Sequence, residues 1–563
     1  MSDNQRLKVV LAWHMHQPQY QDLLSGEFRL PWTYLHATKD YVDMAAHLEA
    51  VPQARAVVNF APILLEQFAE YSAQIERFQR DGTLIQDPLL AALASPSMPA
   101  GPASRTMLVS ACRRSHDQRM IERFPPYLQI CELAARVDEQ PFNIAYLNDE
   151  FLIDLLVWYH LAWIGETVRR SDPRVRRLMD RERGYSLSDR HELLGLIGGL
   201  IASIVPRYRA LAERGQVELS VTPYAHPILP LILDFASARE AMPETTLPPA
   251  MYPGGLDRAR WHIRRGVEVF EKYFGFRPAG CWPAEGSVCQ TSLSLFAEAG
   301  VEWVATGQGV LSHSLHAAGH APHAMKEAWL YRPYRTSGGP ACFFRDDDLS
   351  DRIGFRYATW HTDDAVADFV HALEQSAGCC QDHPDRVVSI VLDGENAWEH
   401  YPENGYYFLS ALYRKLADHP RLELTTFHDA LATSPTQDLT HLVAGSWVHG
   451  NFSTWIGDPQ KNHGWELLVE AKQAFDGAAI AADARALAEK QLAICEGSDW
   501  FWWFGDYNPA ATVSDFDALY RLHLANLYRI LGIAVPATLT RAFAHGHGTP
   551  AHGGTMRPGS ASN

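Results

Sequence analysis

Two carboxylic acids stand where short apolar runs of the sequence give way to polar residues. Glu285 follows Trp282 closely, and Asp393 comes directly after the run Val387–Leu392. Packing does not easily explain charged residues at such positions, because acidic side chains are rarely buried without a partner. Two carboxyl groups can divide catalysis between them: one attacks a carbon or activates water, and the other protonates a leaving oxygen. Glycoside hydrolysis needs this division, and it is our first hypothesis. An ordinary ion pair or a helix cap at each position is the alternative.

A metal-assisted hydrolysis is the second hypothesis. His14 and His16 follow the first apolar run, and side chains two residues apart on an extended chain point to the same side. Together with Asp393, and with His226 as a third possible imidazole, they form a ligand set that a catalytic zinc could use. The same histidines could instead hydrogen-bond sugar hydroxyls or cap strand ends. A zinc site also gives no reason for the Trp and Tyr residues beside these motifs. A non-catalytic glycan-binding protein is the third hypothesis.

The charge balance excludes two classes of partner. Among 563 residues, 66 are acidic and 49 are basic, which gives a net charge of −17. Nucleic acids and anionic membranes are bound through clustered positive charge, so we expect neither as a partner.

The eight cysteines include no CxxC pair, which argues against a disulfide scaffold or a zinc ribbon. The N-terminus lacks the apolar core of a signal peptide, and no apolar run reaches the ~18–20 residues of a membrane span. We therefore expect a cytoplasmic protein.

Seven short runs rich in apolar residues are the elements that must position these side chains. Their continuous apolarity predicts strands buried on both faces, as in a parallel sheet. Helical patterns between them, such as 257–274 and 291–300, indicate βα units. We predict an incomplete (β/α)7 barrel, with an open doubly wound sheet as the alternative. Active sites of such barrels lie at the carboxyl ends of the strands. The runs are Lys8–Trp13, Ala56–Phe60, Val217–Val221, Ala279–Trp282, Val301–Ala305, Ala341–Phe344 and Val387–Leu392.

The remaining sequence predicts two helical regions and a tail. Residues 1–430 form the predicted barrel domain, in which 61–215 is a mostly helical insertion covering the barrel mouth. Residues 431–540 form a C-terminal helical region that packs on the barrel and completes the cleft. Residues 541–563 are rich in Gly, His, Ser and Pro, a composition typical of disorder.

Five segments in order resemble the sequence signatures of glycoside hydrolase family 57. Three are His14–Pro18 (HMHQP), Trp282–Val288 (WPAEGSV) and Asp393–Tyr401 (DGENAWEHY). A further one is Gly215–Leu219 with its continuation to Pro230, and the last is Gly445–Glu466. A single HQP would mean little, but the ordered set is highly specific and spans most of the chain.

The resemblance implies a function and a mechanism. It implies a (β/α)7 barrel that acts on α-glucans with retention of configuration. It also implies that the enzyme needs no catalytic metal or cofactor. It implies that Glu285 is the nucleophile and Asp393 the general acid/base. The fourth motif, DGEN followed by W, E and H, resembles the α-amylase and amylopullulanase group more than the branching enzymes. The expected reaction is therefore hydrolysis of α-1,4 bonds in starch, glycogen or maltodextrins, with α-1,6 bonds as a further target. The alternative is a 4-α-glucanotransferase or a branching enzyme.

Further residues are expected to bind the glucan. His14, His16 and Gln17 are expected to hydrogen-bond the sugar at the cleavage point, with Glu218 and His226 on the adjacent strand end. Arg345, Asp346 and Asp351 are weaker candidates, and for them ordinary surface pairing is the alternative. Sixteen Trp residues are a high number; most should belong to the core, which is also the alternative for Trp360 and Trp455, and several should stack on sugar rings. The sequence leaves the oligomeric state open. The remaining candidates for substrate binding are His400 and the four platforms Trp282, Trp360, Trp398 and Trp455.

Overall fold

Seven parallel strands form the centre of the molecule. The computed structural model describes residues 6–139, 141–320, 325–380, 385–548, 556, 557 and 559. The strands follow one another in the order β7-β5-β4-β3-β2-β1-β8, and all of these neighbours are parallel. Each predicted run overlaps one of them, which confirms the predicted incomplete (β/α)7 barrel. Their bounds are β1 Leu7–Met15, β2 Ala56–Phe60, β3 Val217–Val221, β4 Gly280–Cys281, β5 Trp303–Thr306, β7 Ala341–Phe344 and β8 Val387–Asp393.

The barrel closes weakly between its first and last strands in this order. A single parallel bridge joins Arg345, just after β7, to Ser389 of β8, where the amide of Asp346 donates to the Ser389 carbonyl (2.8 Å). The structure also has three short strands that the sequence did not predict, because two or three residues carry no periodic pattern. They are β6 Tyr334–Arg335, antiparallel to β7, β9 Leu422–Leu424 beside β1, and β10 Gln437–Asp438 beside β6.

Strand residues are buried on both faces of the sheet. Val10 and Ala12 of β1 belong to one apolar cluster with Val57, whereas Val9 and Leu11 belong to the larger surrounding core. Alternate side chains of a barrel strand point inward and outward, so both sets must be apolar when helices cover the outside. The helices of the barrel domain are α1 Trp32–His36, α2 Val42–Glu49, α11 Leu229–Leu233, α12 Gly255–Phe274, α13 Gln290–Glu298, α14 Gln308–Ala317, α15 Asp347–Asp351, α16 Thr362–Cys379, α17 Tyr406–Ala417 and α18 Phe427–Leu431.

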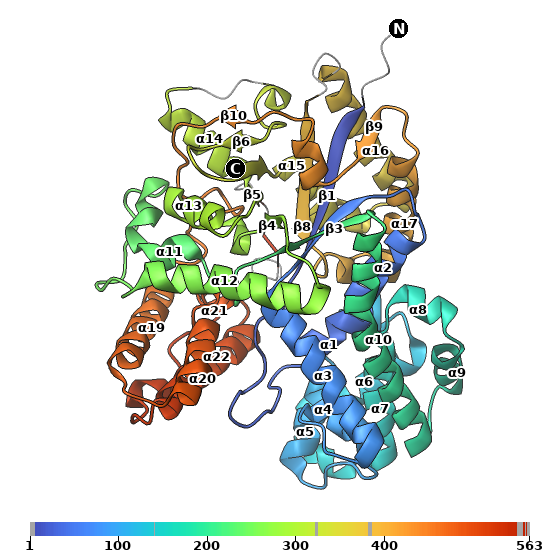
Figure 1. Ribbon diagram of the computed structural model, residues 1–563. Helices are drawn as coiled ribbons and strands as arrows, with labels where there is room; N and C mark the ends of the chain where they lie inside the picture. Colours follow the sequence, from blue (N-terminus) through green and yellow to red (C-terminus); the bar gives the residue numbers. More distant parts are fainter. Residues whose placement is uncertain are drawn as a thin grey trace.

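A group of helices is inserted between β2 and β3. In Figure 1 it forms the blue-to-teal group at the lower right, away from the N-terminus. The first helix begins at a proline, where the missing N–H costs nothing, and ends before the left-handed Gly82 (φ 78°). Its helices are α3 Pro62–Asp81, α4 Pro88–Ala94, α5 Pro102–Ala111, α6 Pro125–Glu139, α7 Asp149–Ala162, α8 Glu166–Ser171, α9 Pro173–Arg181 and α10 Leu187–Glu213.

Among the described residues, α10 alone has the length and apolar composition that would suffice to cross a membrane. The sequence showed no uninterrupted apolar run of that length because polar residues such as Ser203 and Arg207 divide it. A core helix passes the same test, and α10 packs closely on α3: a Cβ at Gly198 would lie 2.7 Å from Ile75. Length and composition are therefore weak evidence for a membrane span here.

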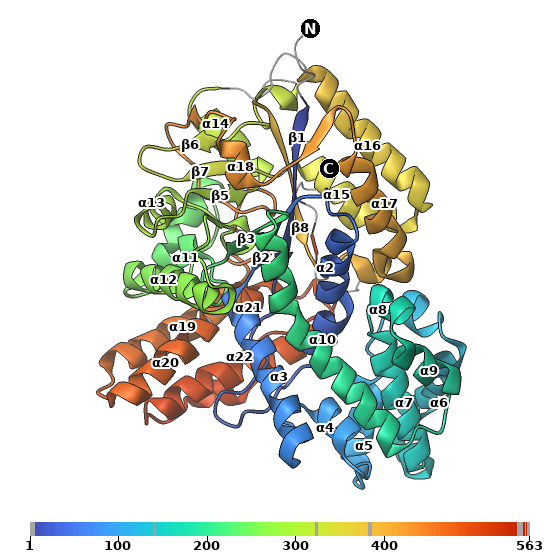
Figure 2. The ribbon, with the colours of Figure 1, turned by 45° about the vertical axis from the view of Figure 1, so that its right-hand side comes forward.

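A second group of helices follows the barrel. Figures 1 and 2 show it in orange and red, on the same side of the sheet as the inserted helices. Part of the segment for which the composition predicts disorder packs on this group. Phe543 contacts Phe504 and Tyr520, with ring centroids 5.0 and 6.4 Å apart, and such burial fixes the chain there. The helices are α19 Pro459–Gly477, α20 Ala482–Cys495, α21 Ser498–Trp503 and α22 Ala510–Ile530.

Candidate active site

Glu285 and Asp393 line the same cleft. Asp393 is the last residue of β8, and Glu285 lies in the short turn Ala284–Gly286 just after β4, so both stand at the carboxyl ends of barrel strands. The cleft has a volume of about 690 Å³ and is bordered by residues of the barrel, the insertion and the C-terminal helices. The structure thus brings together the two carboxyls that the sequence singled out.

The backbone of Glu285 is held in an unfavourable conformation. Its φ of 56° and ψ of 24° lie in the left-handed region, where a residue with a Cβ costs about 1–3 kcal/mol. The amide of Trp447 donates to the Glu285 carbonyl (3.0 Å) and helps to hold this turn. The indole Nε1 of Trp447 also donates to Oε2 of Glu285 (2.9 Å). Such strain persists where the surroundings fix a side chain for a task, which is typical of active sites.

Both carboxyls are harder to ionise than usual. Burial, followed by the nearby charge of Asp393, raises the pKa of Glu285 to about 8, although the Trp447 hydrogen bond acts in the opposite direction. Burial likewise raises the pKa of Asp393 to about 6, against a hydrogen bond from Nδ2 of Asn396 to Oδ2 of Asp393 (2.8 Å). Two coupled groups of this kind lose their protons in two steps that belong to the pair. Between pH about 6 and about 8 the pair therefore holds one proton.

Three stacked imidazoles lie beside the carboxyls. The ring centroids of His16 and His226 are 3.8 Å apart, and Nε2 of His14 lies 3.0 Å from Nε2 of His226. His14 also contacts Oδ1 of Asn59 (2.7 Å). Burial and the neighbouring His16 lower the pKa of His14 to about 3, and burial with both neighbours lowers the pKa of His226 well below its usual value. These two rings are therefore neutral, and each of their four nitrogens bonds to Asn59, to Ser498 or to the other ring.

The start of α21 fixes this stack from the C-terminal region. Nε2 of His16 contacts Oδ1 of Asp499 (2.8 Å), and Nδ1 of His226 contacts Oγ of Ser498 (2.8 Å). The amide of Ser498 also donates to the carbonyl of His226 (2.9 Å), whose φ of 59° is again left-handed. Neither α21 residue could be predicted from the sequence, since more than 270 positions separate them from either histidine.

One group of side chains in the described part of the chain has the geometry of a metal site. The ligand atoms of His16, His226 and Asp499 all lie within 4.8 Å of one another. Two imidazoles and a carboxylate fit zinc by donor type. This group differs from the set that the sequence suggested, because Asp393 and His14 are not part of it. The side chains already bond to one another and to their neighbours, which accounts for their positions without an ion.

A third carboxyl connects the first and fourth motifs. Oε1 of Glu395 accepts hydrogen bonds from the amide of His16 (3.4 Å) and from Nε2 of Gln17 (3.3 Å). The hydroxyl of Tyr20 in turn donates to Oε1 of Gln17 (2.9 Å). Burial, together with the charge of Asp393, raises the pKa of Glu395 well above its usual value. Glu395 lines the cleft but was not among the predicted site residues, although its place in DGEN offered the signal.

Two predicted binding residues have structural partners instead. Glu218 is the second residue of β3, at the opposite end of the barrel, where it accepts hydrogen bonds from Nε1 of Trp303 (2.6 Å) and the amide of His428 (3.0 Å). Asp346 is buried, caps α15 and binds the ammonium of Lys326 (2.8 Å). The cleft lies at the carboxyl ends of the strands, whereas Glu218 stands near the amino end of β3. Asp346 does follow the carboxyl end of β7, but its carboxylate binds Lys326 and the start of α15.

Arg345 lies behind the cleft and supports it. Its guanidinium is buried and pairs with Asp347 (2.9 Å) and Asp351 (2.6 Å). The same group lies 5.3 Å from the ring centroid of Trp447. Its charge also favours the ionised form of Asp393 and so opposes the rise in the pKa of that carboxyl. Arg345 therefore acts on the site through its neighbours.

None of the four predicted Trp platforms borders the cleft as the structure describes it. Trp282 is buried against Trp447, with ring centroids 5.4 Å apart, and Trp398 and Trp455 are core residues. Trp360 is 40% exposed but packs beside Tyr357, away from the cleft. Large apolar rings next to a motif were as easily core residues as platforms. The indoles that do border the cleft are Trp32, Trp163, Trp447, Trp502 and Trp503.

The rim of the cleft joins distant parts of the chain. His400, 46% exposed in its side chain, packs edge-on against His116 of the insertion, with ring centroids 5.3 Å apart. Arg114 of the insertion forms an ion pair with Asp515 of α22 (2.6 Å), and both residues line the cleft. The inserted helices and the C-terminal helices thus meet across the cleft.

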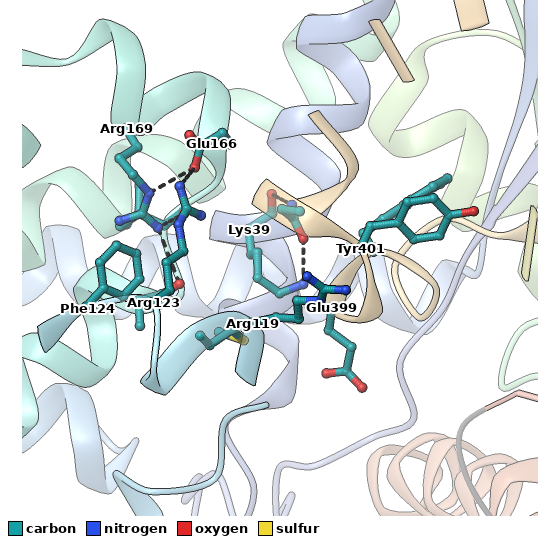
Figure 3. A pocket seen from close by; sticks show the side chains of 13 residues that line it. Lys39, Arg119, Arg123, Phe124, Glu166, Arg169, Glu399 and Tyr401 are labelled. Carbon is teal, nitrogen blue, oxygen red and sulfur yellow. Dashed lines mark hydrogen bonds and ion pairs between the residues drawn. The ribbon is translucent and has the colours of Figure 1, made fainter. Parts of the chain in front are cut away.

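A small basic pocket supports the loop behind His400 (Figure 3). Arg123 and Arg169 share the carboxylate of Glu166 (2.9 and 3.2 Å). Nε of Arg119 donates to the carbonyl of His400 (3.1 Å). The cations of this pocket are already bonded to neighbouring groups. Through Arg119 and His400, the pocket connects the fourth motif to the insertion.

Paired carboxyls in a cleft at the carboxyl ends of barrel strands define a barrel hydrolase. The profile of glycosyl hydrolase family 57 matches residues 10–443. This chain belongs to glycoside hydrolase family 57 and is a glycoside hydrolase. A search of curated proteins gave no match.

Solved structures show the same fold at low sequence identity. A family 57 branching enzyme from Thermococcus kodakaraensis matches with a TM-score of 0.59 and 15% identity, over 99% of this chain and 97% of its own. The α-amylase AmyC from Thermotoga maritima matches with a TM-score of 0.56 and 15% identity, over 94% and 93%. A 4-α-glucanotransferase from Thermococcus litoralis matches with a TM-score of 0.51 and 14% identity, over 93% of this chain and 60% of its own.

Proposed function

We propose that this enzyme cleaves α-1,4-glucans such as starch, glycogen and maltodextrins with retention of configuration, and that α-1,6 bonds are a further target. The observation that carries the proposal is the pair Glu285 and Asp393 in one cleft bordered by five indoles. Flat aromatic rings suit the apolar faces of sugars. Membership of family 57 and the activities named for the similar structures support the substrate class.

The reaction proceeds by double displacement. Asp393 protonates the glycosidic oxygen while the carboxylate of Glu285 attacks the anomeric carbon and forms a covalent glycosyl-enzyme. Asp393 then removes a proton from water, and the resulting attack releases the sugar and regenerates Glu285. His14, His16 and Gln17 border the cleft beside the carboxyls and bind hydroxyls of the reacting sugar.

The protonation of the pair affects the rate. The reactive form has the proton on Asp393 and a charged Glu285. Because Glu285 has the higher pKa of the two, this form is the minor one in the empty cleft. Interactions that favour the Glu285 carboxylate, such as the Trp447 hydrogen bond, therefore raise the rate.

Replacing each carboxyl separates the two roles. Glu285→Gln and Asp393→Asn should both lose most activity on maltooligosaccharides. On an α-maltosyl fluoride, whose leaving group needs no proton, azide should rescue Asp393→Asn with formation of the α-glycosyl azide, because the glycosyl-enzyme still forms and azide attacks it without a general base. Azide with Glu285→Gln should give the β-glycosyl azide. The opposite pair of products would exchange the two roles, and near-normal turnover by Glu285→Gln would exclude it as the nucleophile.

The fold does not choose between water and a sugar as the acceptor, since hydrolases and transferases share it. We propose hydrolysis on the basis of the fourth motif, with glucan transfer as the alternative. Products from a single maltooligosaccharide decide this: only shorter chains mean hydrolysis, and longer chains mean transfer. We further propose that no metal takes part and that the enzyme is cytoplasmic. Chelation should leave the activity unchanged, and a loss restored by zinc would favour a metal at His16, His226 and Asp499.

A further inference from the structure

Residues near the C-terminal end of the chain lie against the active site. The guanidinium of Arg557 stacks over the rings of Trp502 (4.7 Å to the centroid) and Tyr507 (4.8 Å). Its Nη1 donates to Oγ1 of Thr454 (3.3 Å). Trp502 is one of the indoles that border the cleft. Arg557 therefore covers the back of a cleft wall.

Gly559 is held still more closely. Its amide donates to Oδ2 of Asp351 (3.0 Å), and its carbonyl accepts from the amide of His449 (2.9 Å). A Cβ at this position would lie 2.5 Å from Nη1 of Arg345 and 2.6 Å from Cγ of Asp347. Contacts this short force atoms to shift, so the site fits a glycine.

The groups that hold Gly559 lead directly to the catalytic pair. Asp351 pairs with Arg345 (2.6 Å), whose guanidinium lies over the ring of Trp447 (5.3 Å to the centroid). Trp447 in turn hydrogen-bonds Glu285 (2.9 Å). Nε of Arg345 also donates to the carbonyl of Val391 (2.9 Å), two residues before Asp393. One series of contacts thus joins the end of the chain to both carboxyls.

We propose that Arg557 and Gly559 are positioning residues of the active site, which fix Trp502 and the Arg345–Asp351 pair and thereby orient Trp447 and Glu285; this rests on the proposed function of Glu285. Arg557 and Gly559 complete the catalytic centre from outside the barrel. Electrostatics agree with this placement, since the charge of Arg557 lowers the pKa of Glu285 against the effect of burial.

Four variants test the proposal by activity. They are a chain ending after residue 548, Gly559→Ala, Arg557→Met and Arg557→Lys. The first three should lose about 10- to 100-fold in kcat, with a smaller change in KM, because a misplaced nucleophile slows the chemical step. Arg557→Met should also move the alkaline limb of kcat/KM to higher pH, whereas Arg557→Lys, which keeps the charge, should retain most of the limb position. A peptide of residues 549–563 added to the shortened chain should restore part of the activity.

Matched controls separate this effect from general damage. Gly199→Ala has open space for its Cβ, and Arg541→Met removes an exposed cation, so both should behave as the unaltered chain. Unaltered kcat and pH profile in the shortened chain and in Gly559→Ala would overturn the proposal.

Hydrogen exchange tests the docking without any substrate. The amide of His449 donates to Gly559, so its exchange should accelerate in the shortened chain and in Gly559→Ala but not in Gly199→Ala. Unchanged protection would show that Gly559 does not dock there. This measurement keeps the two proposals apart: an unaltered chain without activity on α-glucans refutes the proposed function, whereas unchanged His449 protection refutes only the positioning role.

Discussion

Replacing Trp447 by Phe removes one hydrogen bond from the catalytic pair and leaves an aromatic ring in place. Nε1 of Trp447 donates to Oε2 of Glu285 at 2.9 Å and favours the charged carboxylate. A hydrogen bond to a charged group contributes about 1.5–3 kcal/mol. At about 1.4 kcal/mol per pKa unit, its loss should raise the pKa of Glu285 by about 1–2 units above about 8.

Two features of the pH profile should change. The alkaline limb of kcat/KM reports the higher pKa of the pair, so it should move up by about 1–2 units. The plateau should fall about 10- to 100-fold, because the fraction of enzyme with a charged Glu285 and a protonated Asp393 falls by that factor. If Glu285 were the acid instead, the limb would move but the plateau would stay. The assay is the initial rate on a maltooligosaccharide far below KM from pH 5 to 10.

Trp282→Phe is the matched control. Trp282 packs edge-on against Trp447, and its Nε1 has no hydrogen-bond partner among the described residues. Trp282→Phe should therefore leave the alkaline limb of kcat/KM at its original pH. Equal limb shifts in both variants, or none in Trp447→Phe, would refute the role assigned to this hydrogen bond.

Three further predictions concern Glu285, Glu218 and the Arg114–Asp515 ion pair. Because the pKa of Glu285 is raised on folding, its stabilising effect is complete below pH about 4.5 and is lost as the pH rises through about 8; Glu285→Gln should thus raise Tm more at pH 9 than at pH 5 in thermal unfolding. Glu218→Gln turns an amide toward the N–H groups of Trp303 or His428 and should cost about 1–3 kcal/mol in denaturant unfolding, with kcat unchanged; a fall in kcat would return Glu218 to the active site. Arg114→Gln breaks the Arg114–Asp515 ion pair and should raise kcat/KM on soluble starch up to about fivefold relative to kcat/KM on maltotriose. The double variant Arg114→Asp with Asp515→Arg restores the pair and should reverse this rise. An unchanged ratio would mean that the pair does not limit access of polymer to the cleft.

The barrel could be predicted because burial on both faces leaves a local mark on each strand. All seven strands came from runs rich in apolar residues, and Asp393 and Glu285 were conspicuous because each stands where such a run gives way to polar residues. The short strands β6, β9 and β10 left no such mark. Their pairing depends on neighbours more than 80 residues away in the case of β10 and more than 400 in the case of β9.

The sequence by itself determined the strands, the helical regions, the family and the two carboxyls, because these depend on local apolar patterns and on ordered motifs. Only the tertiary structure decided the surroundings of the carboxyls. Asp499 reaches His16 across 483 positions, and of the five cleft indoles only Trp447 belongs to a motif; the others come from α1, the insertion and α21. The tertiary structure also places Glu218 at the far end of the barrel and Gly559 beside Asp351. A contact between distant segments depends on how helices pack over the barrel, and no local spacing encodes that.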